Sequence, residues 1–161
     1  VLHGTADLGL VAFPIKHKEL NSIPFATDEL VVAMNPDHPL AEKENITIGE
    51  LKNLEFIAFE KDIPTRKATD EILRKAEIEI SIVMEFDNVE TVKRALEINA
   101  GIAIIPKNTV SNEAERKQLV TSRLDDGIYI RPLSLIHKKS RMLTPALRSF
   151  IEKMKLSSEE L

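Results

Sequence analysis

The sequence predicts an α/β fold in which a largely parallel sheet is flanked by helices. Short apolar runs alternate along the chain with segments of helical period, which is the pattern of strands joined by crossover helices. The 161 residues suffice to bury a sizeable core, and a composition of 43% hydrophobic and 30% charged residues is typical of globular proteins. The predicted strands span residues 8–12, 30–34, 56–59, 78–86, 102–105, 119–124 and 128–136.

The run at residues 78–86 differs from the other predicted strands because its hydrophobic residues alternate with glutamate and serine. Met84 and Phe86, for example, flank Glu85. Successive side chains of a strand point to opposite faces. The alternation therefore predicts a strand with one wetter face, near the edge of a sheet.

Capping and proline signals mark the first two helix starts. Thr47 and Glu50 fit a capping box, in which the hydroxyl and the carboxylate satisfy backbone N–H groups of a short helix. Pro64 suits the first turn of a second helix, where its missing N–H is not needed. The predicted apolar face of that second helix consists of Ala68, Ile72, Leu73 and Ala76.

Two further helices are predicted downstream. Asp87 and Glu90 fit a second capping box, which opens a helix with Val92 and Leu96 on its inward face. We expect this helix to end near Gly101, because glycine can take the left-handed conformation that terminates helices. The last helix opens at residues 144–145, and its apolar side chains at the spacing i, i+3, i+4, i+7 are Leu147, Phe150, Ile151 and Met154.

Composition excludes several kinds of function. The chain carries 22 Lys and Arg against 26 Asp and Glu, a formal charge of −4 without a basic block, so it is a poor nucleic-acid binder by itself. It has no cysteine, which excludes disulfides, thiolate nucleophiles and iron–sulfur ligation. An aromatic fraction of 4% argues against an aromatic platform for sugars or single-stranded nucleic acid. No apolar run approaches the roughly 20 residues of a membrane span.

The residues predict no catalytic site, no metal site and no cofactor. The nucleophile-elbow, phosphate-loop and dinucleotide-binding motifs are missing from the sequence. Carboxylates are interspersed with Lys and Arg on predicted helix faces, which favours solvated charges over an acid/base pair. We therefore expect that the chain is not an enzyme. Surface or turn positions, away from metal-ligand spacing, are predicted for His3, His17, His38 and His137.

Anion binding is the chemistry that the residues favour. A helix N-terminus offers unpaired backbone N–H groups and a partial positive charge. Directly after Pro64, Thr65 adds a hydroxyl and Arg66 a guanidinium, which suits bidentate capture of a carboxylate, sulfate or phosphate. The structural alternative is that Thr65 caps the helix and that Arg66 is a solvated surface charge.

Two further segments are candidates to join this site. Asn88 and Val89 lie at the start of the next long helix, and two such helix starts converge if both follow strands of one parallel sheet. The carboxylate of Asp87 would repel an anion there if exposed, but a capping role can occupy it. Phe13 and Pro14 follow the first predicted strand, at the carboxyl end where open α/β sheets bind ligands.

Several short segments occur in an order that is specific in combination. NVETVK at residues 88–93 is followed by NAGIAIIP at residues 99–106, and RPLSLIHKK at residues 131–139 by LTPA at residues 143–146. Together with the segments below, they resemble the effector-binding domain of LysR-type transcriptional regulators. The last two of these segments, with Phe150, resemble the branch that includes regulators of carbon fixation and of cysteine or sulfur metabolism. The other matching segments are ADLGLV at 6–11, DELVV at 28–32, DHPLA at 37–41 and ITIGEL at 46–51.

The resemblance implies a two-lobed fold of the type II periplasmic-binding-protein class, with mixed sheets flanked by helices and an effector in the cleft. The turn clusters at residues 35–39 and 123–127 are the expected crossings. Residues 1–36 and 123–161 would then form lobe I, and residues 37–122 lobe II. The family's N-terminal winged helix-turn-helix domain and the first part of lobe I are absent, so the first lobe is incomplete and we interpret the chain as a fragment.

The resemblance also gives the candidate anion site a role. The expected effector is a small anionic metabolite. Where the family commonly has a flexible glycine in this loop, the chain has Pro64, which stiffens the loop and leaves the identity of the effector open. The residues expected to hold the effector are Pro64, Thr65, Arg66, Asn88 and Val89, with Phe13 and Pro14 as walls from lobe I.

The expected partners follow from the same resemblance. Closure around the effector would shift a two-state equilibrium that repositions attached DNA-binding domains, so DNA is contacted only through the missing N-terminal domain. The full-length protein is expected to be a cytoplasmic homo-oligomer, a dimer or tetramer, without a membrane partner. The alternatives are an extracytoplasmic solute-binding receptor of a transporter and an enzyme of related two-lobed fold. HPL at residues 38–40 and GIAIIP at residues 101–106 favour the regulator.

Overall fold

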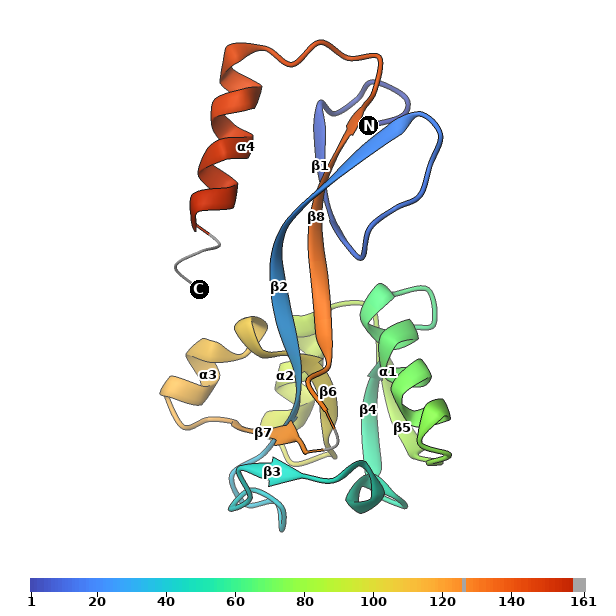
Figure 1. Cartoon of the computed structure of the whole chain (residues 1–161). Coiled ribbons are helices and arrows are strands. Elements are labelled where there is room, and N and C mark those ends of the chain that lie inside the picture. The colour runs from blue at the N-terminus through green and yellow to red at the C-terminus, as the bar shows by residue number, and fades with distance from the viewer. Residues whose placement is uncertain (126, 158–161) are drawn as a thin grey trace. The chain divides into compact units, whose positions relative to one another are not determined.

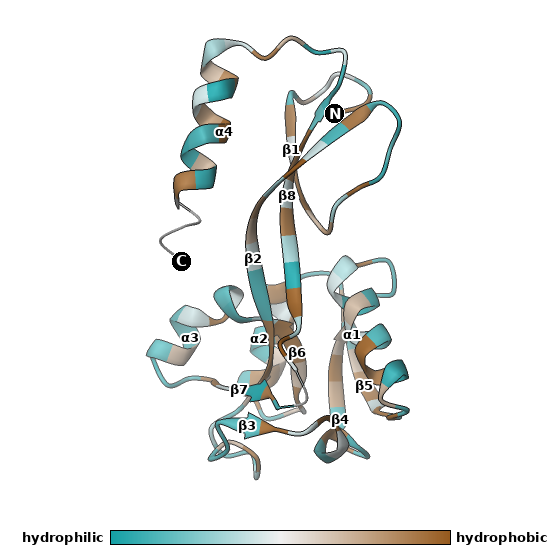
Figure 2. Ribbon diagram, in the orientation of Figure 1, coloured by the Kyte–Doolittle hydropathy of each residue, from teal (hydrophilic) through white to brown (hydrophobic). Residues whose placement is uncertain are grey.

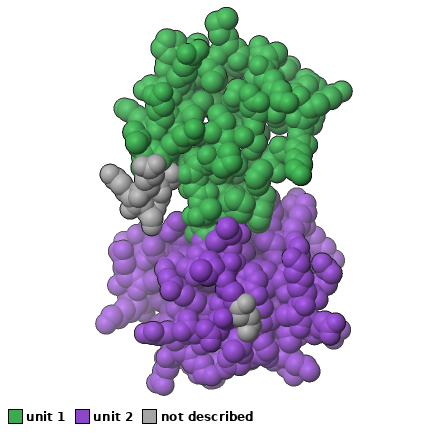
Figure 3. Space-filling model, in the orientation of Figure 1, with its two compact units in different colours: residues 1–28, 131–161 green, residues 29–130 purple. Residues whose placement is uncertain are grey.

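The computed structural model describes residues 1–125 and 127–157 and divides the chain into two compact units (Figure 3). Unit 1 consists of Val1–Asp28 together with the segment from Arg131 onwards, and unit 2 consists of Glu29–Ile130. Each unit contains strands and helices. The α/β class predicted from the sequence is therefore confirmed.

The units change over at residues 28/29 and 130/131, whereas the sequence placed the lobe boundaries at residues 36/37 and 122/123. Both predicted crossings lie inside unit 2, and Asp126 of the second one lies outside the described residues. The assignment of residues 1–36 and 123–161 to one lobe stays a prediction.

The described residues of unit 1 contain three strands, one of them shared with unit 2, and one long helix (Figure 1). β1 (Leu8–Ala12) has the bounds that the sequence predicted, and it pairs antiparallel with β8 (Ile130–Lys138). The next strand in the order is β2 (Leu20–Met34), whose later residues belong to unit 2. The helix α4 (Pro145–Ser157) begins at the predicted proline.

The core of unit 1 is small. On α4, Ile151 is buried as predicted, whereas Phe150 is 47% exposed. On β1, Leu10 is 61% exposed although it lies within the apolar run that predicted the strand. The hydrophobic side chains that are buried in the described part of unit 1 are Leu20, Leu135, Ile136 and Ile151.

The larger sheet of unit 2 is mixed. β2 pairs antiparallel with both β6 (Ala103–Pro106) and β7 (Val120–Leu124), and β7 pairs parallel with β3 (Asn45–Ile46). The mixed sheets that the resemblance implied are therefore confirmed. The largely parallel sheet predicted from apolar runs alone was wrong, because a strand buried on both faces reads as an apolar run whatever its direction.

A second sheet of unit 2 contains two parallel strands, β4 (Glu55–Phe59) and β5 (Ser81–Phe86). Figure 2 shows both as mainly hydrophobic. β4 is the one partner of β5 in the described part of the chain, so the predicted edge position of β5 is confirmed. The strand begins at Ser81, three residues later than predicted. The preceding residues are not part of it, because the N–H of Ile78 donates to the Leu73 carbonyl at 3.0 Å and closes the end of α1.

The helices of unit 2 begin where the local signals place them, with one correction. The short 3₁₀ helix Ile48–Leu51 has the predicted capping box, and α1 (Pro64–Lys75) begins at the predicted proline. At the start of α2 (Val89–Glu97) the predicted box of Asp87 and Glu90 was wrong. Asn88 is the N-cap, and its Oδ1 accepts from the N–H of Thr91 at 2.9 Å. The N-cap therefore lies one residue later than predicted. Glu90 is then no longer at the third helical position, from which a glutamate side chain bonds the N-cap backbone N–H in a capping box.

The end of α2 also differs from the prediction. Asn99, with φ of 57°, takes the left-handed conformation, not Gly101. Gly101 is needed for a different reason: it has φ of 148°, and a Cβ there would lie 2.6 Å from the carbonyl oxygen of Glu55. The backbone of β4 approaches this residue too closely for any other side chain.

Each face of the sheets of unit 2 carries its own hydrophobic cluster. Leu30, Val32 and Met34 of β2 belong to one cluster, which α1 covers with Ile72 and Leu73. The intervening Ala33 belongs to the other cluster, which α2 covers with Val92, Ala95 and Leu96. The predicted inward face of α2 is confirmed, since Val92 and Leu96 are both fully buried. A short 3₁₀ helix (Lys107–Thr109) and α3 (Ser111–Glu115) were not predicted.

Candidate functional site

The starts of α1 and α2 lie at the carboxyl end of the two parallel strands β4 and β5. β4 and β5 are parallel neighbours with Phe59 opposite Phe86, and the N–H of Glu60 donates to the Phe86 carbonyl at 2.9 Å. Each helix follows the carboxyl end of one of these strands. The geometry required for two helix N-termini to converge is therefore present within unit 2.

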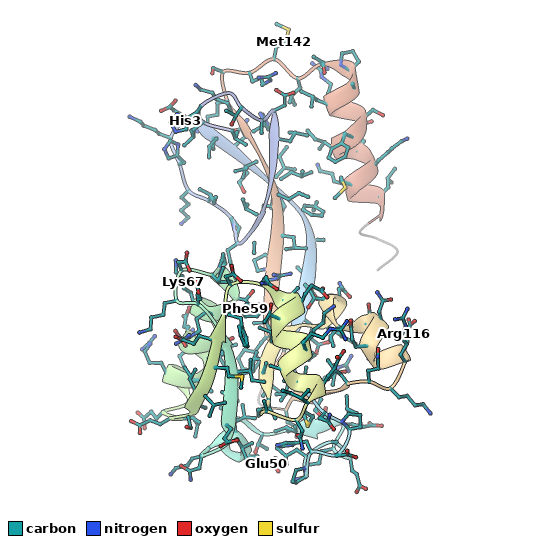
Figure 4. All side chains as sticks on the ribbon, turned by 180° about the vertical axis from the view of Figure 1, so that it is seen from behind. His3, Glu50, Phe59, Lys67, Arg116 and Met142 are labelled. Carbon is teal, nitrogen blue, oxygen red and sulfur yellow. The ribbon has the colours of Figure 1, made fainter. Side chains whose placement is uncertain are left out.

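Thr65 and Arg66 occupy the first turn of α1 and are both buried, with 3% and 6% exposure. The N-cap of α1 is Ile63 and makes no side-chain cap. The alternative that Thr65 is a helix cap and Arg66 a solvated charge was therefore wrong for both residues. Figure 4 shows the side chains of this region, with the labelled Phe59 and Lys67 before and after them in the chain.

The Arg66 guanidinium is held by three acceptors from three elements. Its Nη1 donates to the carbonyl oxygen of Phe59 at 2.7 Å, and its Nε donates to Asp70 Oδ1 at 2.8 Å. Nη1 also donates to Glu85 Oε1, which forms an ion pair with it. The side chain is thus anchored to β4, α1 and β5 at once.

The charges of this group stabilise one another. The hydrogen bond from Arg66 holds the pKa of the Glu85 carboxyl below its ordinary value, and burial opposes that shift. Burial acts to lower the pKa of Arg66, but the hydrogen bonds to Glu85 and Asp70 outweigh it and raise the pKa. Both groups are therefore charged at neutral pH, as an ion pair with only one partner buried.

An open hollow of about 380 Å³ lies over this ion pair. Lys61, Arg66 and Glu85 supply its charged lining. Its other lining residues are Ile82, Val83 and Met84 of β5. Beneath β4 a much smaller cavity of about 10 Å³, which Arg66 and Asp70 also line, has room for about one water molecule.

The start of α2 presents mainly backbone to a ligand. The Asn88 side chain is engaged as the cap, with its Oδ1 also 2.9 Å from Thr91 Oγ1 and its Nδ2 donating to Asp87 Oδ1 at 2.7 Å. Asp87 thus contacts the capping amide, and it is not the cap itself. Val89 is half-buried at the first position of the helix.

Phe13 and Pro14 belong to unit 1, whereas the other predicted site residues belong to unit 2. Phe13 has φ of 66°, a strained conformation for an aromatic residue, and its N–H donates to the Pro132 carbonyl at 2.7 Å. The structure thus shows a fixed backbone turn directly after β1. The role of Phe13 and Pro14 as walls of the effector site stays a prediction.

Three residues of this site were not predicted from the sequence, namely Lys61, Asp70 and Glu85. Asp70 could have been found, because it lies four residues after Arg66 and such pairs meet on one helix face. Glu85 reaches Arg66 only because β5 lies beside β4, which no local pattern reveals.

One histidine lies in a different environment from the one that the sequence predicts. The prediction of surface histidines was wrong for His137, which is buried on β8 with its Nδ1 3.1 Å from the Lys138 carbonyl oxygen.

Within residues 1–125 and 127–157, no group of three or more His, Asp and Glu side chains is placed to hold a metal ion. Nor does any helix in these ranges combine the length and the apolar character needed to cross a membrane.

Comparisons with known proteins agree on one family. The profile described as "LysR substrate binding domain" matches residues 1–156. The "Probable RuBisCO transcriptional regulator" of Cyanophora paradoxa is 29% identical over 160 residues, covering 96% of this chain and 49% of that protein. The chain spans about half the length of the curated relatives it matches.

Solved structures show the same fold. The CcmR regulatory domain of Synechocystis PCC6803, in complex with 2-PG, superposes with a TM-score of 0.88 at 26% identity, covering 99% of this chain and 77% of that one. The effector binding domain of QuiR, in complex with shikimate, gives a TM-score of 0.85 at 18% identity, covering 99% and 75%. The fold is thus that of effector-binding regulatory domains of the type II periplasmic-binding-protein class, as the resemblance implied. The chain belongs to the LysR substrate-binding domain family.

Proposed function

We propose that this chain is the effector-sensing part of a LysR-type transcriptional regulator and that its effector is a small anionic metabolite. The observation that carries the proposal is the family match over residues 1–156. The CcmR domain, which is 26% identical, was solved in complex with 2-PG, and the QuiR domain, which shares the fold, was solved with shikimate. Curated relatives named as transcriptional regulators favour this function over a solute-binding receptor of a transporter.

The parent protein acts, on this proposal, without catalysis of its own. Effector binding shifts the equilibrium between two forms of a cytoplasmic homo-oligomer and so repositions DNA-binding domains that lie outside this sequence. The curated relatives are about twice as long as this chain, which leaves room for such domains. The 161 residues by themselves, with a net charge of −4, do not bind DNA specifically.

The effector contacts unit 2 at the starts of α1 and α2, through Thr65, Arg66 and the backbone at Asn88 and Val89. Support comes from the convergence of the two helix starts at the carboxyl ends of the parallel strands β4 and β5. Arg66 adds a preorganised guanidinium, and Pro64 fixes the backbone that presents it. A charge-assisted hydrogen bond of this kind contributes about 1.5–3 kcal/mol to binding.

Calorimetric titration with 2-PG and with shikimate tests the proposal on three variants of the 161-residue chain. Thr65→Ala and Arg66→Lys should weaken binding of the responsive anion by roughly 10- to 100-fold, since each alters a group at the start of α1. Lys67→Ala is the matched control, because it removes an exposed charge from the same turn. Binding of every responsive anion by Thr65→Ala and Arg66→Lys with wild-type affinity would place the site elsewhere.

A further inference from the structure

The ion pair over β5 joins a buried cation to a much more exposed anion. The Arg66 side chain is 6% exposed and is also held by Phe59 and Asp70, so it keeps its position when one acceptor leaves. The Glu85 side chain is 42% exposed and lies on the edge strand, so it can turn into water without breaking the fold. The fixed partner is the cation and the replaceable partner is the anion.

The guanidinium also retains binding capacity. Of its five N–H donors, the Nε–H bonds Asp70, and the two on Nη1 bond Phe59 and Glu85. For the two donors on Nη2, the structure shows no acceptor among the described residues. An oxyanion that replaced the Glu85 carboxylate on Nη1 could therefore bond Nη1 and Nη2 together, which is the strong bidentate arrangement.

Lys61 brings a second cation to the same place. It lines the hollow with Arg66 and Glu85, and its charge contributes to the lowered pKa of the Glu85 carboxyl. A singly charged anion that displaces the Glu85 carboxylate only exchanges one ion pair for another. It also loses translational freedom on binding, so its net gain in binding free energy is small. A doubly charged oxyanion gains additional attraction from Lys61, so phosphate-type groups are favoured over monocarboxylates.

We propose that Glu85 is a built-in competitor at the anion site of Arg66 and that the effector is an oxyanion of phosphate type which displaces it. The inference rests on the proposed function and adds to it the class of ligand and a device that sets the binding threshold. While Glu85 occupies Nη1, the competent fraction of the protein is reduced, and the apparent affinity falls in the same proportion. Neutralising Glu85 therefore raises affinity without adding a contact to the ligand.

The test is calorimetric titration of the 161-residue chain with inorganic phosphate and, separately, with acetate. Glu85→Gln should bind phosphate about 3- to 10-fold more tightly than wild type, the range expected from losing an ion pair with one exposed partner. Wild type should bind phosphate more tightly than acetate. Asp62→Asn is the matched control, because it removes an exposed carboxylate from the loop that precedes α1 and should change phosphate affinity by less than about 2-fold.

A second pair of variants separates displacement from a general change of charge. In the Arg66→Lys background, which keeps the charge but lacks the fork, adding Glu85→Gln should give less than about half of the gain seen in the Arg66 background. An equal gain in both backgrounds, a gain of the same size from Asp62→Asn, or no phosphate binding by wild type and Glu85→Gln alike would overturn the inference. If Arg66→Lys weakens effector binding but Glu85→Gln leaves the phosphate affinity unchanged, the role of Glu85 as a competitor is refuted. The proposed function still stands in that case.

Discussion

Unit 2 and unit 1 bury their hydrophobic residues to very different extents. The sheets of unit 2 carry a cluster on each face, and a helix covers each cluster. In unit 1 four hydrophobic side chains are buried in the described part, while Leu10, Phe150 and Leu156 are 47–64% exposed. Because stability follows the apolar area removed from water, we expect unit 2, which buries many more hydrophobic side chains, to be the more stable of the two units.

The largest expected effect is on the core of unit 2. Leu96→Asp places an unpaired carboxylate in a fully buried position on α2 and should destabilise the chain by about 3 kcal/mol or more, out of a total of about 5–15. Chemical denaturation followed by circular dichroism measures the loss. Leu96→Met, which conserves volume, should cost less than about 1.5 kcal/mol. Near-wild-type stability of Leu96→Asp would contradict the buried position of this face.

The counterpart in unit 1 tests whether the two cores are independent. Ile151→Ala truncates a buried side chain of α4 and should cost about 2 kcal/mol, at the low end for such changes because the core of unit 1 is small. Hydrogen exchange should show lost protection in β8 and α4 while α2 and β6 keep theirs. Leu156→Ala, at an exposed position of the same helix, is the control. Loss of protection in α2 as well would mean that the cores unfold together.

A backbone change probes the tight packing of unit 2 without removing apolar surface. Gly101→Ala would bring a Cβ to 2.6 Å from the Glu55 carbonyl oxygen and force a positive φ on alanine, so we expect a loss of about 1–3 kcal/mol. Thermal unfolding measures it. Gly49→Ala is the control, since a Cβ there meets no atom closer than 3.9 Å. Equal stability of both variants would show that β4 can move away from residue 101.

The smallest effect concerns an ion pair that joins α2 to α3 in unit 2. Lys93 Nζ lies 2.9 Å from Glu113 Oε1, and its hydrogen bond holds the Glu113 pKa below the ordinary 4.5. A lowered carboxyl pKa contributes stability above pH 4.5, which is lost as the pH falls through the folded-state value. Glu113→Gln should therefore cost about 0.5–1 kcal/mol at pH 7, and the difference should shrink below pH 4.5.

Urea unfolding of wild type and Glu113→Gln at several pH values between 7 and 3 measures this dependence. Glu115→Gln, at an exposed position on the same helix, is the control and should show no such trend. A stability difference between wild type and Glu113→Gln that stays constant over this range would mean that the Glu113 charge is not what stabilises the contact between α2 and α3.

Local signals predicted the fold best where one residue type determines one conformation. The bounds of β1, the starts of α1 and α4, and the capping box at Thr47 all follow from patterns a few residues long. The prediction failed for β2, which spans 15 residues instead of five. Its first ten residues include Asn21, Ser22 and Pro24 and lack the apolar pattern, because pairing in the sheet rather than burial defines them as a strand.

The candidate site was predictable only in part, for a similar reason. Thr65 and Arg66 stood out because a hydroxyl and a guanidinium follow a helix-starting proline. The partners that decide what Arg66 can bind come from a strand 19 residues further along and from the carbonyl of Phe59. Those contacts depend on the register of β4 against β5, which the sequence does not state.

The edge position of β5 has a consequence for handling the protein in solution. Ile82, Val83 and Met84 form an exposed run of high β-propensity on an edge strand, which is the kind of segment that recruits strands from other molecules into aggregates. Glu85 is the charged residue within that strand which discourages such pairing. The Glu85 carboxylate, which pairs with Arg66, thus also protects the chain against aggregation. A Glu85 substitution that makes the domain a more sensitive sensor is therefore expected to lower its colloidal stability, unless a new charge is introduced elsewhere along β5.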